Sequence, residues 1–301
     1  MVLTHWFKRG LAALGIAALA AGCTTATETS SGGSGPALWR VADKDTTVYL
    51  FGTIHLLPPG SQWRTPKLEN AVARSNGLVV ETIIDAKNPA ELAGVMMRLG
   101  LNPSLPPLIN RVPPEKRAAL QAAVAASGVP MAAYDRMETW AAAFTLIGTQ
   151  FRSIGLKSEE GVETVLKQAF TSAGKPVGQL ETNAEQLGFF DALPEEAQRT
   201  LLVASLDRPD QVREQFNGML TAWLRGDIDA IARTFNEDMA GSPALGDALL
   251  RRRNANWARW IESRMAQPGA VMVAVGAGHL AGDSSVQAML QQRGLKVTRI
   301  Q

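Results

Sequence analysis

The sequence is poor in cysteine, histidine and tyrosine. Its 301 residues include one cysteine, Cys23, three histidines and two tyrosines. The chain after Cys23 therefore has no thiol for a disulfide or a thiolate metal site. Its 30 lysines and arginines nearly balance 28 aspartates and glutamates. Because nucleic-acid-binding proteins carry a basic patch or stripe, we expect no nucleic-acid partner.

Residues 1–22 are expected to be a signal peptide. Lys8 and Arg9 precede an apolar run, 11–21, that is too short to span a bilayer. The run ends in Leu19-Ala20-Ala21-Gly22-Cys23, which resembles the lipobox of bacterial lipoproteins. That resemblance implies that Cys23 is lipidated and becomes the mature N-terminus. Lipidation would also explain a lone cysteine in an exported protein. The alternative is an ordinary signal peptide with an incidental cysteine.

Residues 23–37 are expected to be a flexible tether. The stretch TTATETSSGGSGP is small, polar and rich in glycine and serine, so it cannot bury enough apolar surface to order itself. Thr24, rather than aspartate, follows Cys23, and by lipoprotein sorting rules this favours the outer membrane over the inner one. We expect a lipoprotein of the cell envelope that faces the periplasm, with residues 38–301 forming a single domain.

The folded part alternates between strand-like and helix-like segments. A hairpin is expected where two strand-like runs flank the turn residues Asp43-Lys44-Asp45. The expected strands are 39–41, 46–52, 78–80, 175–180, 270–275 and 295–300. Helical patterns are expected at 89–99, 113–126, 135–152, 158–173, 184–266 and 284–292. This order predicts an α/β fold with a central mixed β-sheet, a strand-end active site and a large helical insertion.

Two of the three histidines share one local context. His55 follows the apolar run VYLFGTI, and His279 follows VMVAVGAG, each in a Gly-x-x-His pattern that begins at Gly52 or Gly276. A glycine at the end of a strand lets the backbone turn sharply and approach a ligand. The alternative is that both histidines are hydrogen-bonded parts of the structure and bind nothing.

Glutamates follow two other strands, at Glu81 and Glu181. The carboxyl ends of parallel strands lie on one edge of a sheet, so His55, Glu81, Glu181 and His279 could meet in one cleft. Their order along the chain suggests two mirrored halves. Two imidazoles and two carboxylates without a thiolate would suit Mn, Zn, Co or Fe. A further pattern, Arg251-Arg252-Arg253, is expected to place at least two arginines on a solvated helix face.

Several of these residues together resemble the TraB/GumN family, whose distant relatives include the metazoan Tiki proteins, which are membrane-tethered proteases. The resemblance covers essentially all of residues 38–301. It is carried, in order, by the stretches 51–55, 80–82, 179–186, 253–254 and 275–282. It implies a hydrolase that depends on a divalent metal, peptidase-like, with a peptide or small-molecule substrate. Gly161-Val162-Glu163 stands where members often have glycine, a hydrophobic residue and aspartate.

With the resemblance, the hypothesis of metal-assisted hydrolysis assigns roles to single residues. His55, His279 and one or both glutamates, with Glu181 as the first choice, would bind the metal (Mn, Zn or Co), with a position left open for water. The glutamate that does not bind the metal, Glu81 in this assignment, would act as general base. The pair Arg253-Asn254 would hold a substrate carboxylate or stabilise an oxyanion. Glu185, in contrast, lies in a predicted first helical turn, where a carboxylate suits the helix dipole.

Two other functions remain open from the sequence. One is a non-catalytic periplasmic lipoprotein that binds a metal, haem or a peptide in the same cleft. The other is a structural lipoprotein whose histidines only hydrogen-bond to the backbone. A binding protein needs no general base, so replacement of Glu81 by glutamine would separate it from an enzyme.

Overall fold

The computed structural model describes residues 35–84, 88–240 and 242–301. The predicted signal peptide, Cys23 and all but the last three residues of the predicted tether lie outside these ranges. Within the described ranges, no helix has the length and apolar character needed to cross a membrane.

A mixed six-stranded sheet forms the centre of the fold, in the order β4-β3-β5-β2-β1-β6. Its strands are β1 (Leu38–Ala42), β2 (Thr46–Thr53), β3 (Gly77–Val80), β4 (Val177–Gln179), β5 (Gly269–Gly276) and β6 (Val297–Arg299). Strands β2, β5, β3 and β4 are parallel, whereas β1 is antiparallel to both β2 and β6. The predicted α/β class with a mixed sheet is confirmed.

The hairpin of β1 and β2 turns where the sequence predicted it. The side chain of Asp43 accepts hydrogen bonds from the backbone N–H groups of Asp45 and Thr46, at 3.1 and 2.8 Å. An aspartate that bonds to the backbone two or three residues ahead stabilises a tight turn locally. The turn sets the register of the hairpin, in which Ala42 pairs with Thr47.

Helices cover both faces of the sheet because its strands are apolar on both sides. Alternate residues of β2 enter two different clusters: Val48 and Leu50 face α13 (Arg252–Arg264) and α14 (Val286–Gln292), while Phe51 faces α2 (Pro66–Arg74) and α7 (Val162–Ser172). A strand alternates its side chains between the two faces. Sheets with parallel strands are buried in this way.

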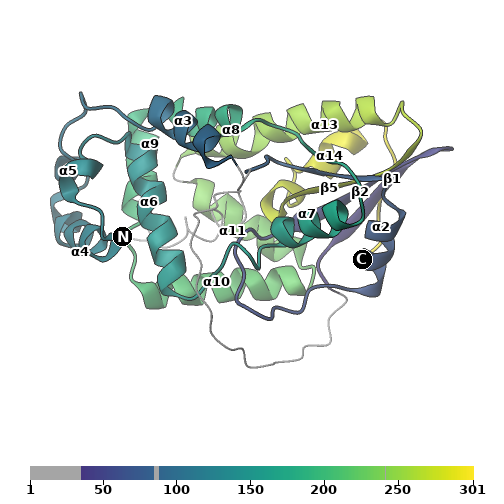
Figure 1. Cartoon of the computed structure of the whole chain (residues 1–301), viewed down its shortest axis with the longest axis horizontal. Coiled ribbons are helices and arrows are strands. Elements are labelled where there is room, and N and C mark those ends of the chain that lie inside the picture. The colour runs from purple at the N-terminus through teal and green to yellow at the C-terminus, as the bar shows by residue number, and fades with distance from the viewer. Residues whose placement is uncertain (1–34, 85–87, 241) are drawn as a thin grey trace.

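The predicted helical insertion is present, and part of it forms the end of the molecule away from the sheet (Figure 1). Its helices lie between β3 and β4 and between β4 and β5. They are α3 (Pro89–Leu99), α4 (Arg117–Ser127), α5 (Met131–Tyr134), α6 (Thr139–Ser153), α8 (Asn183–Asp191), α9 (Glu195–Ala204), α10 (Pro209–Leu224), α11 (Ile228–Ala240) and α12 (Pro243–Gly246). Short 3₁₀ turns lie at Leu108–Asn110, Pro114–Lys116 and Ala277–Leu280, and a π-helix, η3, at Asp247–Arg251.

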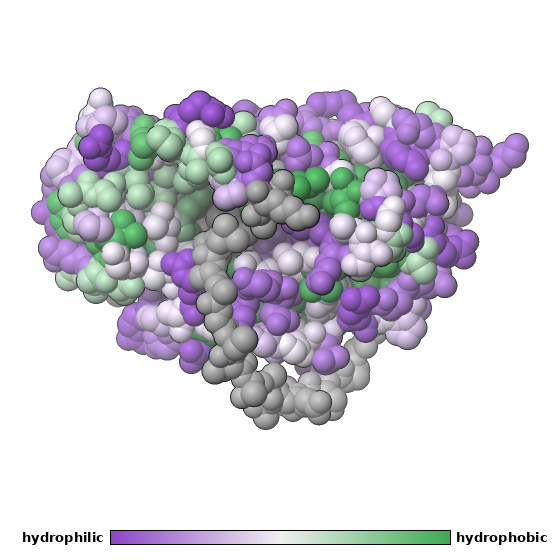
Figure 2. All heavy atoms as spheres, in the orientation of Figure 1, coloured by the Kyte–Doolittle hydropathy of each residue, from purple (hydrophilic) through white to green (hydrophobic). Residues whose placement is uncertain are grey.

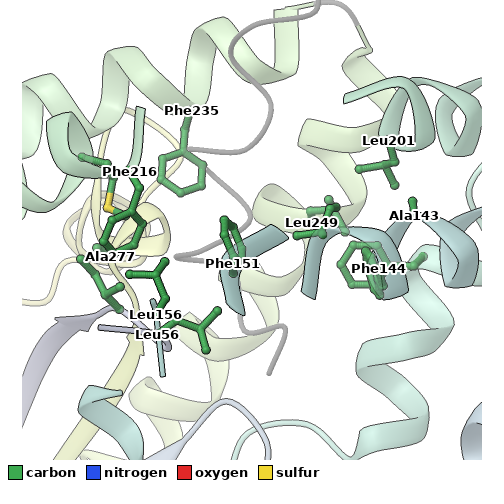
Figure 3. Packing of buried hydrophobic residues seen from close by; sticks show 14 of the residues in the cluster. Leu56, Ala143, Phe144, Phe151, Leu156, Leu201, Phe216, Phe235, Leu249 and Ala277 are labelled. Atoms are coloured by element: carbon green, nitrogen blue, oxygen red, sulfur yellow. The ribbon is translucent and has the colours of Figure 1, made fainter. Parts of the chain in front are cut away.

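One hydrophobic cluster joins the helices to the edge of the sheet. Figure 3 shows Phe151 of α6 between two groups of its members. Toward the sheet lie Leu56, Leu156, Phe216, Phe235 and Ala277, and toward the far helices lie Ala143, Phe144, Leu201 and Leu249. On the visible surface, apolar residues gather over the helices, while hydrophilic residues prevail around the sheet (Figure 2). Met97 and Leu101 are the exposed large hydrophobic residues of the described chain.

The helix predicted from Ser158 begins later, at Val162. The preceding residues pair with the loop that follows β2 instead of joining the helix. Leu57 and Lys157 exchange backbone hydrogen bonds of 3.2 and 3.1 Å, and the N–H of Val162 donates to the carbonyl of Ile54 at 3.0 Å. This long-range pairing satisfies backbone groups that a helix would otherwise use.

Helix α2 was not predicted from the sequence. Its start carries two ordinary signals: Thr65 accepts a hydrogen bond from the N–H of Leu68 at 3.2 Å, and Pro66 is the first helical residue. A threonine N-cap followed by proline is a typical helix start.

Candidate active site

Four strand ends meet at one edge of the sheet. Because β2, β3, β4 and β5 are parallel, His55, Glu81, Glu181 and His279 all lie beyond the same edge. The strand order places the two glutamates beside each other and the two histidines beside each other. Strands β2 and β5, which precede the two histidines, are neighbours, with Thr53 opposite Gly276. The suggested mirrored halves are therefore not what the sheet shows.

The side chain of Arg253 lies at the centre of this edge. It is fully buried, and its Nε donates to both oxygens of Glu181 at 3.0 Å. Its Nη2 donates to Oε2 of Glu81 at 2.7 Å, and its Nη1 lies 3.1 Å from Nε2 of His279. One guanidinium thus links three of the four predicted strand-end residues.

The two carboxylates receive further hydrogen bonds from the protein. Oε1 of Glu81 accepts from the backbone N–H of Gly276 at 2.6 Å, and its Oε2 accepts from the amide of Gln186 at 3.0 Å. Oε1 of Glu181 accepts from the indole N–H of Trp257 at 2.9 Å. Every oxygen of both carboxylates has a donor, as a buried polar network requires for stability.

The contacts of His279 determine its tautomer. The amide nitrogen of Asn254 donates to the carbonyl oxygen of Ser284 at 2.7 Å, so its Oδ1 is the atom that faces Nδ1 of His279 at 2.5 Å. Nδ1 of His279 therefore carries the proton, and its Nε2 accepts from Arg253. Burial and the nearby charge of Arg253 hold the pKa of His279 well below its ordinary value of 6.5. His279 is neutral in this setting.

The indole ring of Trp257 packs against His279 and Arg253, and burial affects the pKa of Glu181. The ring of Trp257 lies 4.3 Å from that of His279 and 4.7 Å from the guanidinium carbon of Arg253. A cation over an indole face is attracted by its π-electrons. Burial raises the pKa of Glu181, although the charge and hydrogen bonds of Arg253 act to lower it.

His55 has a different partner from the other strand-end residues. Its Nδ1 lies 2.8 Å from Oε1 of Glu163, and the hydroxyl of Thr53 donates to the same oxygen. The His55 and Glu163 side chains are only 10% and 12% exposed. Nε2 of His55 and Oε2 of Glu163 are buried and have no hydrogen-bond partner. These are the free polar atoms of the described site.

The pKa shifts of His55 and Glu163 favour the charged form of each side chain. Burial lowers the pKa of His55, but the charge of Glu163 and the hydrogen bond to it outweigh burial, so the pKa is raised above 6.5. Burial raises the pKa of Glu163, but the charge and hydrogen bond of His55 outweigh it, so this pKa is lowered below 4.5. An adjacent opposite charge stabilises each ionised form.

Gly161 allows this pair to form. A Cβ at position 161 would lie 2.0 Å from the carbonyl oxygen of His55, closer than any real side chain can approach. Glycine lets the 157–161 loop lie directly against the chain after β2. Glu163, two residues later, then lies in the first turn of α7 beside His55.

The predicted motif glycines also allow close packing. A Cβ on Gly52 would lie 3.2 Å from Cα of Ala277, and the carbonyl of Gly52 accepts from the indole of Trp223 at 2.8 Å. Gly276 brings its backbone N–H against Glu81, as described above. This contact is with a side chain of the protein, so the predicted backbone approach to a ligand stays a prediction.

A divalent metal held jointly by Glu81, Glu181 and His279 does not fit this arrangement. The lone pairs of these side chains point at Arg253 and other donors. Among the described residues, no group of three or more His, Cys, Asp or Glu side chains is placed to hold an ion. The metal-ligand roles of His55, His279 and Glu181 stay predictions, as do the catalytic roles of Glu81, Arg253 and Asn254.

A cavity of ≈ 360 Å³ lies on another side of the cluster. Its walls include Phe235, Asp247, Asn254, Gly278 and Asp283. It reaches Asn254, but neither His55 nor Arg253 lines it, so it does not open onto the free atoms of His55 and Glu163.

The sequence analysis gave no site role to three side chains of the site: Glu163, Gln186 and Trp257. The pattern Gly161-Val162-Glu163 was the available signal for Glu163, but its partner could not be read from the sequence. Glu185 forms a capping box with Thr182, which confirms its expected helix-start position. The neighbouring Gln186 is buried and bonds to Glu81.

Comparison with known proteins places the chain in a family. The family model described as TraB/PrgY/gumN matches residues 37–299. The uncharacterized protein YbaP of Escherichia coli K12 is 27% identical over 251 residues, which cover 81% of this chain and 87% of YbaP. YbaP of Shigella flexneri is similar to the same extent. No solved structure matches. With nearly all of its described residues inside the match, the chain belongs to the TraB/PrgY/gumN family.

Proposed function

We propose that this protein is a hydrolase in which His55 is the general base. One observation carries the proposal: Nδ1 of His55 is bonded to Glu163 at 2.8 Å, while its Nε2 is buried without a partner. A carboxylate on one ring nitrogen orients the imidazole and leaves the other nitrogen for proton transfer. Acyl-transfer enzymes on unrelated folds use such histidine–carboxylate pairs.

The proposed reaction is hydrolysis of an amide or ester. A water molecule at Nε2 of His55 loses a proton to that nitrogen while its oxygen forms a bond to the carbonyl carbon. Glu163 stabilises the imidazolium that results, through the hydrogen bond on Nδ1. When the tetrahedral intermediate breaks its bond to the leaving group, His55 returns the proton to the leaving amine or alkoxide. The imidazole is then ready for another cycle.

His55 is preferred to Glu81 and His279 as base for a structural reason. Both oxygens of Glu81 already accept hydrogen bonds from Gly276, Gln186 or Arg253. Both ring nitrogens of His279 are engaged, by Asn254 and by Arg253. A general base needs a lone pair within reach of the substrate proton. This revises the sequence-based assignment of Glu81 to that role.

Peptides are the first substrates to test, since the family that the sequence resembles has the Tiki proteases as distant relatives. The proposal includes a lipid tether at Cys23, which would hold the site at the envelope and expose it to periplasmic peptides. Metal dependence, which the same resemblance implies, is not part of this proposal, because Glu81, Glu181 and His279 already bind Arg253.

The test is a hydrolysis screen of the purified full-length protein against mixed peptides and simple esters. Products would be identified by mass spectrometry for the wild type, His55→Asn and Glu163→Gln. Glu262→Gln, in a surface ion pair with Arg293, is the matched control for loss of a carboxylate. Loss of the base is expected to reduce turnover by about 10²–10⁴-fold.

Full turnover in His55→Asn would disprove the assignment. Peptide binding with no turnover of any probe would instead favour the non-catalytic binding lipoprotein. In that case Glu163→Gln and Glu81→Gln should leave peptide affinity unchanged.

A further inference from the structure

Arg253 occupies the position that a metal ion would need at this edge of the sheet. Its guanidinium contacts Glu81, Glu181 and His279 together, at 2.7 to 3.1 Å. Imidazole nitrogens and carboxylate oxygens are the atoms that bind divalent metals in sites without thiolates. Arg253 and a metal ion would therefore compete for the same lone pairs.

The charge of Arg253 is permanent, because a guanidinium is not deprotonated in proteins. Two buried carboxylates require compensating positive charge, and Arg253 supplies one unit of it while it bonds to both. Neutral His279 accepts from Nη1 of Arg253 through its Nε2. The acceptors of the cluster thus have donors without an ion.

Arg253 is the buried member of three consecutive arginines. Arg251 and Arg252 are exposed, and both bond to the side chain of Asp247. The sequence-based expectation that at least two arginines of the run lie on a solvated face is confirmed. The five residues before Arg252 form the π-helix η3. A π-turn adds a residue to the helix and changes which position faces inward, and such turns are frequent at functional sites.

We propose that Arg253 is a built-in cation that takes the place of a divalent metal among Glu81, Glu181 and His279. Removal of its charge would turn the cluster into a binding site for a divalent cation such as Zn²⁺ or Co²⁺. The inference concerns metal occupancy alone and goes beyond the proposed hydrolysis, so either can fail without the other.

The test compares metal binding by the full-length wild type, Arg253→Met and Arg252→Met. Each protein would be loaded with Zn²⁺ or Co²⁺, dialysed and measured by elemental analysis. Near-stoichiometric metal is expected in Arg253→Met only, and it should disappear in Arg253→Met/His279→Ala. Arg252→Met is the matched control, because it removes the neighbouring arginine from the surface. Arg253→Lys keeps a charge at the site and should bind no metal.

Arg253→Met leaves two carboxylates buried, so its folding is followed by circular dichroism during thermal unfolding. If that variant is unstable alone, Zn²⁺ should raise its unfolding temperature and leave that of Arg252→Met unchanged. A folded Arg253→Met that binds no metal, or one that Zn²⁺ does not rescue, would overturn the inference. So would near-stoichiometric metal in the wild type that is lost in Glu181→Gln or His279→Ala.

Discussion

Nδ1 of His55 lies 2.8 Å from a carboxylate oxygen of Glu163, in a pair from which Nε2 of His55 remains free. The other Gly-x-x-His motif ends differently, since Nδ1 of His279 faces the amide oxygen of Asn254 and its Nε2 faces Arg253. The pKa of His55 is raised, whereas that of His279 is lowered. The surroundings therefore favour the charged form of His55 and the neutral form of His279, although both histidines have the same sequence context.

The pH dependence of hydrolysis should follow the raised pKa of His55. A general base works only when deprotonated, so the rate should increase with pH through an inflection above 6.5, the ordinary histidine value. Glu163→Gln removes the charge that raises this pKa, so the inflection should move to lower pH while the maximal rate falls. The measurement is kcat/KM against pH for both proteins.

The stability of the protein should also depend on the His55–Glu163 pair. A raised histidine pKa gives stability that is complete below 6.5 and is lost as pH rises through the folded-state pKa. A lowered glutamate pKa gives stability that is complete above 4.5 and is lost as pH falls through its folded-state pKa. The contribution should therefore be greatest between pH 4.5 and 6.5.

Urea unfolding of the wild type and His55→Asn at a series of pH values checks this. The difference in unfolding free energy between the two proteins should shrink on both sides of that window. A difference that stays constant across the range would show that the pair is not ionised in the folded state.

Asn254→Ala should destabilise the protein without touching any charge. It leaves the Nδ1–H of His279 buried without an acceptor, which costs about 1–3 kcal/mol. Asn256→Ala is the matched control, because Asn256 is exposed on the same helix. Chemical unfolding of both variants measures the effect, and equal stability of the two would contradict the tautomer assigned to His279.

Gly161→Ala should damage both stability and hydrolysis. The new Cβ would collide with the carbonyl oxygen of His55 and push the loop away from the base. Gly188→Ala is the control: a Cβ there meets no atom within 4 Å, and alanine in a helix is favoured over glycine by about 0.5–1 kcal/mol. Opposite shifts in unfolding temperature are expected, and a fully active Gly161→Ala would argue against a fixed position for His55.

Cys23→Ser should release the protein from the membrane fraction if Cys23 carries the lipid. Metabolic labelling with palmitate should mark the wild type and leave this variant unlabelled. Thr24→Ser, one residue further along, is the control and should change neither result. Labelling that persists in Cys23→Ser would show that the lipid is not attached at Cys23.

The sequence by itself determined the local parts of this protein. Runs of apolar, strand-forming residues identified the strands, and the polar residues after four of them are Glu81, Glu181, His55 and His279. Those features depend only on near neighbours in the chain, because strand propensity and turn chemistry are local properties. The α/β order followed from the same patterns.

Only the tertiary structure decided which side chains neutralise one another. The lateral order of the strands put the two histidines side by side, and a long-range backbone pairing brought Glu163 to His55. Arg253 lies on the buried face of α13 with Trp257 and Ile261, whereas Arg251 and Arg252 are exposed. Charge pairing in a buried site depends on distances of a few ångströms between distant segments, and those distances exist only once the sheet and helices have packed.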